Sequence, residues 1–241
     1  MKTNLSLLTF LFFAALTFTS CTMQAQNRIS SETYRVSSFN AIVSNSVGNI
    51  HFSQGSSTSV RAEGNQETID NLRISVKDGK LVIDMAKRPF KRFNLGRKKL
   101  DIYISSPTLS VLQMNGVGNV TLEGNINTPQ LEIISDGVGN LKAEELSCEN
   151  ITIDSEGVGN ITLAGKTNSL SISSDGVGNV HAEELIAKNA TVTSDGIGNV
   201  SFYASESMDV SSDGVGNVTY YGNPKNKNIT KDGVGKLKPG N

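Results

Sequence analysis

The chain has 241 residues, of which 22 are Lys or Arg and 23 are Asp or Glu. This balance excludes the basic excess typical of nucleic-acid-binding proteins, so we expect no nucleic-acid partner. Aromatic residues make up 6% of the chain and Trp is absent, so the core must be built from smaller aliphatic side chains. The abundance of Gly, Ser, Thr, Asn and Val favours an all-β fold with many turns.

Residues 1–20 have the features of a signal peptide. Lys2 supplies a positive charge, and the hydrophobic stretch after it is too short to span a bilayer comfortably. The letters FTSC, which end at Cys21, resemble a bacterial lipobox, so we expect cleavage before Cys21 and lipidation of its thiol and amine. The alternative is cleavage after Ala25 by a peptidase that does not process lipoproteins. Residues 21–33 are expected to be a linker.

The two cleavage interpretations predict different locations for the mature protein. Several acyl chains on one residue would anchor it stably, which indicates an outer-membrane lipoprotein facing the periplasm or the cell surface. Cleavage after Ala25 would instead release a soluble periplasmic or secreted protein.

The part of the chain between Phe39 and about residue 110 is irregular, and we expect one coil followed by an excursion. The expected elements are a coil near Phe39–Phe52, a strand at Val60–Ala62, a short helix between Asn65 and Leu72 with Asn65 as its cap, a hairpin from Ile74 to Met85 turning at Asp78-Gly79, and a strand at Leu100–Ile104 that re-enters the solenoid. Regular coils are expected from about residue 100 onward.

A basic segment lies within this excursion, from Lys87 to Lys99, and reads KRPFKRFNLGRKK. It is either a solvated loop or a contact with anionic lipid headgroups, lipopolysaccharide or an acidic glycan. The candidate contact residues are Lys91, Arg92, Arg97, Lys98 and Lys99.

The strongest signal in the sequence is a repeat of the hexapeptide Asp-Gly-Val-Gly-Asn-Val. Its first glycine recurs every 18–21 residues, at Gly116, Gly137, Gly157, Gly176, Gly196, Gly214 and Gly233. A degenerate copy lies at Ser46–Ile50. A unit of about 20 residues holds two or three short strands that cannot bury a core alone, so we expect a β-solenoid with coils stacked about 4.8 Å apart.

Each motif position suggests a structural role. We expect the first glycine to adopt a positive φ at a sharp turn, and the second to allow close approach of the neighbouring backbone. The apolar residue between the glycines, such as Val177, is expected to face the core. The Asn, such as Asn179, is expected to bond to its counterparts above and below and to adopt a left-handed kink.

The acidic residue before the first glycine also recurs, at Asp136, Glu156, Asp175, Asp195, Asp213 and Asp232. Stacked carboxylates repel one another, so we expect them at an exposed, screened turn. A line of weak calcium sites is the alternative, although the toxin-type calcium repeat has a shorter period and an Asp after its glycines.

Catalytic and metal-binding patterns are weak. His51 and His181 occupy different repeat positions, which argues against a Ser-His-Asp site or a zinc site. Cys148 aligns with Ala187, so we expect a small buried residue rather than a reactive thiol. We therefore expect no enzyme, no metal and no cofactor; the alternative is an enzyme that acts on envelope polysaccharide.

The C-terminal end of the repeat is rich in lysine. In the last motif copy Lys236 replaces the Asn, and Pro239 follows. Charge and Pro on an exposed solenoid edge discourage end-to-end growth, so we expect a cap here.

The repeated Gly-x-Gly-Asn motif, together with YRVSSFNAIVSNSVGNIHF, KDGKLVIDM, LDIYISSP and NGVGNV, resembles the GIN domain family of auto-transporter adhesin heads of Bacteroidetes-type bacteria. The resemblance covers roughly residues 34–238, so we assign residues 34–241 to one such domain. It implies a right-handed parallel β-helix that is exported and often membrane-anchored. Its expected role is a binding scaffold for a glycan, lipopolysaccharide or envelope protein, and it supplies no catalytic residues.

Overall fold

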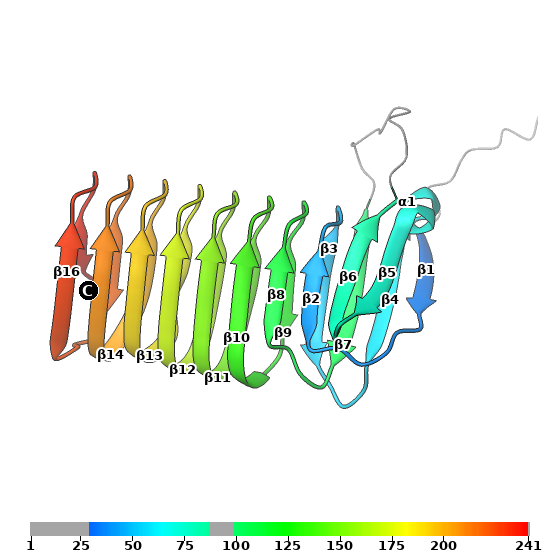
Figure 1. Ribbon diagram of the computed structural model, residues 1–241, viewed down its shortest axis with the longest axis horizontal. Coiled ribbons are helices and arrows are strands. Elements are labelled where there is room, and N and C mark those ends of the chain that lie inside the picture. The colour runs from blue at the N-terminus through cyan, green and yellow to red at the C-terminus, as the bar shows by residue number, and fades with distance from the viewer. Residues whose placement is uncertain (1–28, 87–98, 241) are drawn as a thin grey trace, which may run out of the picture.

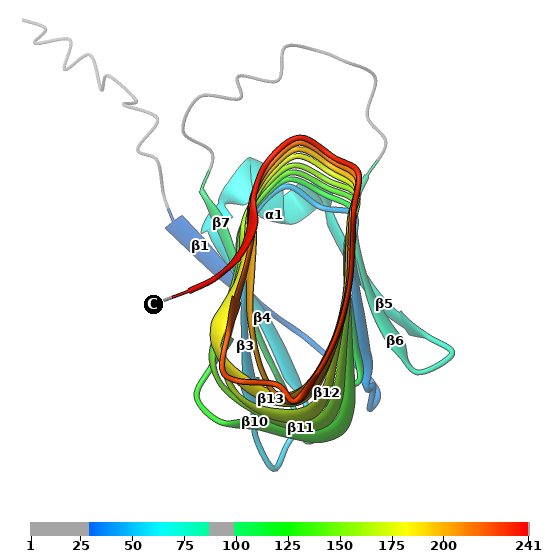
Figure 2. The ribbon, with the colours of Figure 1, turned by 90° about the vertical axis from the view of Figure 1, so that its left-hand side faces the viewer.

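A computed structural model of the protein describes residues 29–86 and 99–240. Its strands wind into a solenoid of stacked parallel coils, as the repeat predicted (Figure 1). Seen from its C-terminal end, successive coils superimpose on a tall, narrow cross-section (Figure 2). The core is a single column of buried apolar side chains, most of them aliphatic, with Phe52 and Phe202 as its largest members.

The regular coils begin at Val111, and long strands turn the corners of each coil without a break. They are β8 (Val111–Met114), β9 (Val120–Glu123), β10 (Ile126–Ser135), β11 (Leu141–Ser155), β12 (Ile161–Ser174), β13 (Val180–Ser194), β14 (Val200–Ser212), β15 (Val218–Tyr221), β16 (Asn226–Lys231) and β17 (Leu237–Pro239). One such corner lies at Glu183-Glu184 within β13, where two consecutive residues of the strand face away from the core.

The repeated hexapeptide forms a ridge along one edge of the solenoid, which we call the crest. Every crest loop is bonded to the loops on both sides. In the loop of β12 and β13, the N–H of Val177 donates to the carbonyl of Gly157 and the N–H of Gly178 donates to the carbonyl of Ile197, both at 2.9 Å. The N–H groups of Asp175 and Gly176 share the carbonyl of Ser155, also at 2.9 Å.

Both motif glycines are required, but for reasons that differ from the sequence-based expectation. The second glycine, not the first, has a positive φ; it is +155° at Gly178. A Cβ added there would lie 1.7 Å from the carbonyl oxygen of Gly159. At Gly176, a first glycine, φ is not positive, but an added Cβ would still lie 2.2 Å from the carbonyl oxygen of Gly157.

The apolar residue between the glycines faces solvent, so the expectation of a buried column was wrong. Val177 is 49% exposed and Val215 is 53% exposed. Val234, which has no coil beyond it, is 71% exposed, so a stacked neighbour covers part of each side chain. The backbone of this residue forms bridges to its counterparts, and the two flanking glycines turn the chain so that the side chain projects outward. Strand periodicity does not apply inside this tight loop.

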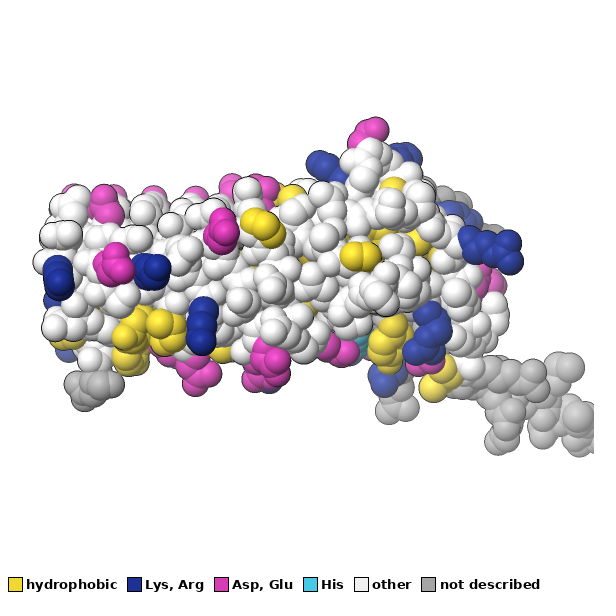
Figure 3. Space-filling view, turned by 90° about the horizontal axis from the view of Figure 1, so that it is seen from below, with side chains coloured by type: hydrophobic (Ala, Val, Ile, Leu, Met, Phe, Trp, Pro, Cys, Tyr) yellow, Lys and Arg dark blue, Asp and Glu magenta, His cyan; other side chains and the backbone are white. Residues whose placement is uncertain are grey.

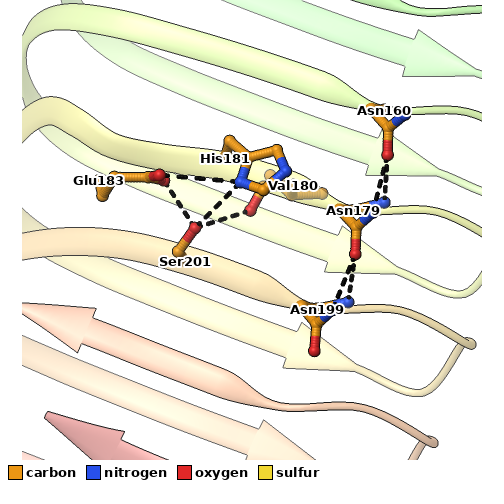
Figure 4. Close-up of polar contacts among 7 residues, drawn as sticks. All are labelled: Asn160, Asn179, Val180, His181, Glu183, Asn199 and Ser201. Carbon is orange, nitrogen blue, oxygen red and sulfur yellow. Dashed lines mark hydrogen bonds and ion pairs between the residues drawn. The ribbon is translucent and has the colours of Figure 1, made fainter. Parts of the chain in front are cut away.

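The motif asparagines form the expected ladder (Figure 4). The Nδ2 of Asn179 donates to Oδ1 of Asn160 at 2.9 Å, and the Nδ2 of Asn199 donates to Oδ1 of Asn179 at 3.0 Å. Each Oδ1 also accepts the next backbone N–H, at 3.0 Å between Asn199 and Asn179. The expected left-handed kink at Asn is absent: among the described residues, Asp78 is the only non-glycine with a positive φ.

The ladder has a direction, and the structure ends it differently at each side. At its start, Nδ2 of Asn49 donates to Oδ1 of Asp101 at 2.9 Å, so a carboxylate, which only accepts, takes the place of a further Asn. At its end, the backbone N–H of Lys236 donates to Oδ1 of Asn217 at 3.0 Å. The Asn side chains at both ends of the ladder therefore also have hydrogen-bond partners.

The N-terminal excursion supplies the elements that were expected and some that were not. They are β1 (Ile29–Tyr34), β2 (Ala41–Ser44), β3 (Asn49–Gln54), β4 (Ser59–Asn65), α1 (Gln66–Asn71), β5 (Leu72–Lys77), β6 (Lys80–Met85) and β7 (Leu100–Ser106). The hairpin turns at Asp78-Gly79 as predicted, with positive φ at both residues. Asn65 occupies the N-cap position of α1, but its side chain makes no capping hydrogen bond.

The spatial order of the coils differs from their order in the sequence. The coil of β2 and β3 lies against that of β8 and β9 on one side and against β6 and β7 on the other. The strand Leu100–Ser106 therefore belongs to an end coil, and regular coils do not start near residue 100. The antiparallel strands β1, β4 and β5 and the helix α1 complete this end of the molecule (Figure 1).

The last coil has the features of the predicted cap. Lys227 pairs with the buried Met208, and Lys231 pairs with the buried Ser212, so lysines stand at core positions. The Nζ of Lys227 lies 5.0 Å from the centre of the Tyr220 ring, and the Nζ of Lys231 donates to the carbonyl of Gly233 at 2.8 Å. Another coil stacked here would have to bury these ammonium groups, which opposes further growth.

We expect Gly178→Ala to lower the free energy of unfolding by about 3 kcal/mol or more, because its Cβ overlaps a carbonyl oxygen and its φ is strained. Val177→Ser, one residue away, is expected to cost less than about 1 kcal/mol because the side chain is half exposed. Urea denaturation followed by circular dichroism measures both. Equal losses in the two variants would contradict the orientation of the crest loop.

We expect Asn179→Ala to lower the free energy of unfolding by about 1–3 kcal/mol, because it leaves two donors of Asn199 without their acceptor. Asn150→Ala is a matched control on another face, where the amide has no partner among the described residues; its cost should stay within about 0.5 kcal/mol. Thermal unfolding of both variants tests the ladder, and a harmless Asn179→Ala would rule out a stabilising role.

Candidate binding surfaces

Most of the residues that the sequence singled out for binding cannot be placed. Cys21, Lys91, Arg92, Arg97 and Lys98 lie outside the described residues. Lys99 is described: its side chain is 75% exposed, and its Nζ lies 3.7 Å from Oδ2 of Asp101. Since Asp101 ends the Asn ladder, this basic residue stands at the N-terminal end of the solenoid, next to the first coils.

The described start of the chain lies beside the basic segment. In the antiparallel pair β1–β4, Ile29 is the register partner of Asn65. The N–H of Asn65 donates to the carbonyl of Lys99 at 3.2 Å. Ile29 lies within the segment expected to be a linker, residues 21–33, but the structure places residues 29–33 in the paired strand β1. Ile29 and Lys99, which ends the basic segment, are neighbours through Asn65.

A hollow on the outer face of this end gathers charged and aromatic side chains from strands that are distant in sequence. Its volume is about 310 Å³, and Thr33, Ser53, Ser59 and Ser105 contribute hydroxyl groups to its wall. The strand register sets Arg61, Tyr103 and His51 side by side. We call these three residues with Glu123 the N-terminal cluster.

Tyr103 is held between its two neighbours. The guanidinium carbon of Arg61 lies 4.6 Å from the centre of the Tyr103 ring, a cation–π distance. The His51 ring stacks on Tyr103 with centres 4.9 Å apart and planes inclined by 18°. Because both ring neighbours are protein side chains, Tyr103 braces β4, β7 and β3 and offers little open ring face for a ligand.

The charges of the N-terminal cluster are paired within the protein. Arg61 forms an ion pair with Glu63, and the Nδ1 of His51 lies 3.0 Å from Oε1 of Glu123. The Nε2 of His51 lies 3.6 Å from Oδ1 of Asp101. Because the basic side chains of Arg61 and His51 each lie beside a carboxylate, the hollow is polar but does not favour the binding of an anion.

A second polar cluster lies on the regular coils, where His181, Glu183 and Ser201 meet (Figure 4). The Oγ of Ser201 donates to Oε2 of Glu183 at 2.6 Å. Both side chains face the same ring nitrogen, Nδ1 of His181, at 3.5 Å from Ser201 and 3.7 Å from Glu183. A serine nucleophile needs the base and the orienting carboxylate on opposite ring nitrogens, so this arrangement does not activate Ser201.

The acidic column runs along the crest with its side chains exposed, as expected. Within residues 29–86 and 99–240, no group of three or more His, Cys, Asp or Glu residues is placed to hold a metal ion. Over the same residues, no helix has the length and hydrophobicity needed to cross a bilayer.

Cys148 is a small buried core residue, as the repeat alignment predicted. It is 8% exposed, and it occupies the same register position as Thr128, Thr167 and Ala187. Burial raises the pKa of its thiol, which keeps the sulfur protonated and unreactive at neutral pH.

Comparison with known proteins identifies the solenoid. Residues 38–224 match the family described as "Putative auto-transporter adhesin, head GIN domain". The chain belongs to this family. Among solved structures, a putative adhesin from Bacteroides fragilis NCTC 9343 resembles this GIN domain protein at 34% identity with a TM-score of 0.83. The match covers 88% of this chain and 97% of that chain.

Two structures from Parabacteroides distasonis ATCC 8503 share the fold at 20% identity. A putative adhesin has a TM-score of 0.67 over 89% of this chain and 98% of its own. A putative lipid binding protein has a TM-score of 0.64 over 88% of this chain and 97% of its own. No match was found among curated proteins. The family and its similar adhesin from B. fragilis indicate an adhesin-like, non-enzymatic role for an exported or surface protein.

We expect Cys148 to resist thiol reagents in the folded GIN domain protein, because it is buried and its pKa is raised. In a Cys21→Ser background, labelling with a chromogenic disulfide should be slow in buffer and complete in denaturant. Since the fold disfavours the thiolate, stability should also fall as the pH rises above the ordinary thiol pKa. Fast labelling in buffer would contradict the burial.

Proposed function

We propose that this GIN domain protein is an exported, lipid-anchored, non-enzymatic adhesin whose N-terminal end rests on a membrane. In this arrangement acyl chains on Cys21 enter the bilayer, and the basic segment from Lys87 to Lys99 contacts anionic headgroups. The coils then extend away from the membrane and present their faces to a partner. The proposed location is the outer membrane.

The observation that carries this proposal is the adjacency of Ile29, Asn65 and Lys99. The chain from Cys21 enters strand β1 at Ile29, and the basic segment ends at Lys99, directly before β7. Both proposed membrane contacts therefore leave the folded domain at the same end. A lipid anchor combined with a basic patch binds anionic membranes more strongly than either signal alone.

The features of the C-terminal end support an orientation in which this end points away from the membrane. The crest carries eight stacked members from Val47 to Val234, which at about 4.8 Å per coil gives a length of roughly 35 Å. Lys227 and Lys231 stand at core positions of the last coil, so their charges oppose the stacking of another copy on the C-terminal end. Ligand contacts would then be made by the faces along the coils.

We expect Lys91→Ala/Arg92→Ala/Arg97→Ala to weaken binding to vesicles that contain phosphatidylglycerol. Each basic residue near an anionic surface contributes about 1 kcal/mol, so the loss should be on the order of a hundredfold. Flotation of the Cys21→Ser protein with anionic and with phosphatidylcholine vesicles measures this electrostatic part separately from the lipid anchor.

The matched control removes three lysines from the coils, Lys166→Ala/Lys188→Ala/Lys225→Ala, and should bind like the parent. Equal losses in both triple variants would show a general charge effect and refute the oriented contact. Mass spectrometry of the mature N-terminus tests the anchor: an unmodified chain that begins at Gln26 would refute lipidation at Cys21.

A further inference from the structure

A shallow groove crosses the coils on one side of the solenoid. It lies between the crest and the edge opposite the crest, which we call the lower edge. It consists of two adjoining hollows of about 350 and 460 Å³, which share Asn189 and Thr191. Two columns in register line the first hollow. One contains Gln130, Asn150, Ser169 and Asn189, and the other contains Thr152, Ser171 and Thr191. We call this surface the polar groove.

The depth of the polar groove follows from side-chain size. Its smallest members, Ser169 and Ser171, both lie on β12, and the longer Asn150 and Asn189 lie on the strands to either side. The core residues Ile151 and Leu170 are 1% and 2% exposed, so they contribute backbone rather than side chain to the floor.

Several polar groups of this groove are available for a ligand, whereas Oδ1 of Asn189 accepts a hydrogen bond from Oγ of Ser207 at 2.6 Å. Among the residues that the structure describes, the side chains of Asn150, Ser171 and Thr191 have no hydrogen-bond partner. The Asn ladder at the crest is the contrast, since its amides are bonded to one another and to backbone N–H groups. The same solenoid thus carries one amide column that is used for stacking and one that is open to solvent.

The lining restricts the chemistry of the ligand. The first hollow has no charged side chain and no exposed apolar side chain in its wall. Charges lie beyond it at both ends: Glu132 is the register partner of Thr152, and Asp209, Lys225 and Lys227 line the second hollow. A peptide cannot add here as a strand, because β11, β12 and β13 are each paired on both sides. What remains is an uncharged ligand rich in hydroxyl groups.

The surface around the solenoid agrees with this chemistry. The lower edge is covered largely by uncharged polar side chains and backbone, with acidic, basic and hydrophobic side chains scattered over it (Figure 3). No single-sign patch therefore runs along the visible coils to favour a charged polymer.

We propose that the polar groove binds a linear, uncharged glycan that lies along the solenoid axis. The coils repeat about every 4.8 Å, and one sugar ring of an extended chain has a similar length, so successive rings can meet equivalent amide and hydroxyl groups. This inference rests on the proposed function, because it names the partner that the adhesin-like protein holds while its other end contacts the membrane.

The test measures binding of the soluble Cys21→Ser protein to an array of linear glycans. The array contains neutral hexose and N-acetylhexosamine polymers, with polygalacturonate as a charged comparison. We expect retention on at least one neutral polymer. Asn150→Ala/Asn189→Ala removes two amides and should weaken that binding roughly tenfold.

Steric filling gives an independent variant with a matched control on the same strand. Ser171→Leu fills the groove and should abolish retention, whereas Thr162→Leu, exposed near the start of β12 and outside the groove lining, should leave it unchanged. Both variants are checked for unchanged unfolding midpoints before binding is compared.

Several outcomes would overturn the glycan site. They are a parent protein that binds no neutral polymer, equal binding by Ser171→Leu and Thr162→Leu, or retention on polygalacturonate alone. Vesicle flotation is measured on the same preparations. A protein that binds glycan but not anionic vesicles would refute the membrane orientation and leave the glycan site intact. A protein that binds anionic vesicles but no neutral glycan would refute the glycan site and leave the membrane orientation intact.

Discussion

The stacking of one crest loop directly on the next, with no room for a side-chain carbon at either glycine, is the constraint on which the rest of the structure depends. An added Cβ at Gly178 would meet a carbonyl oxygen at 1.7 Å, so the loops can approach to hydrogen-bonding distance only as glycine. This approach fixes the vertical register of every coil. The Asn ladder and the half-exposed column around Val177 follow from that register.

A stacked column must also end, and the two ends of this molecule use different chemistry. Asp101 accepts from the first Asn of the ladder and receives Lys99 and His51 beside it, so the end of the ladder adjoins the N-terminal cluster. At the far end, Lys227 and Lys231 stand where other coils have core or buried residues. The N-terminal end of the ladder is thus closed by a carboxylate that accepts, and the C-terminal end of the solenoid by lysines that oppose further stacking.

The sequence predicts the parts of the fold that depend on local spacing. The period, the Asn ladder, the hairpin at Asp78-Gly79 and the burial of Cys148 could all be read from it. The orientation of Val177 could not, because alternation of inward and outward residues fails in a loop whose flanking glycines turn the chain. The N-terminal cluster could not either, because Tyr103 meets Arg61 through the antiparallel pairing of β4 with β7 and meets His51 through the parallel pairing of β3 with β7.

The coils differ in length, and the differences appear as register shifts between the long strands. Between β11 and β12 the shift lies at Ala143/Leu146, and between β13 and β14 shifts lie at Ala182/Ile186 and Ala187/Asn189, all away from the crest. Coils of different length therefore share one crest. A coil can thus gain or lose residues along the edge opposite the crest, beside the polar groove, without disturbing the stacking of the crest loops.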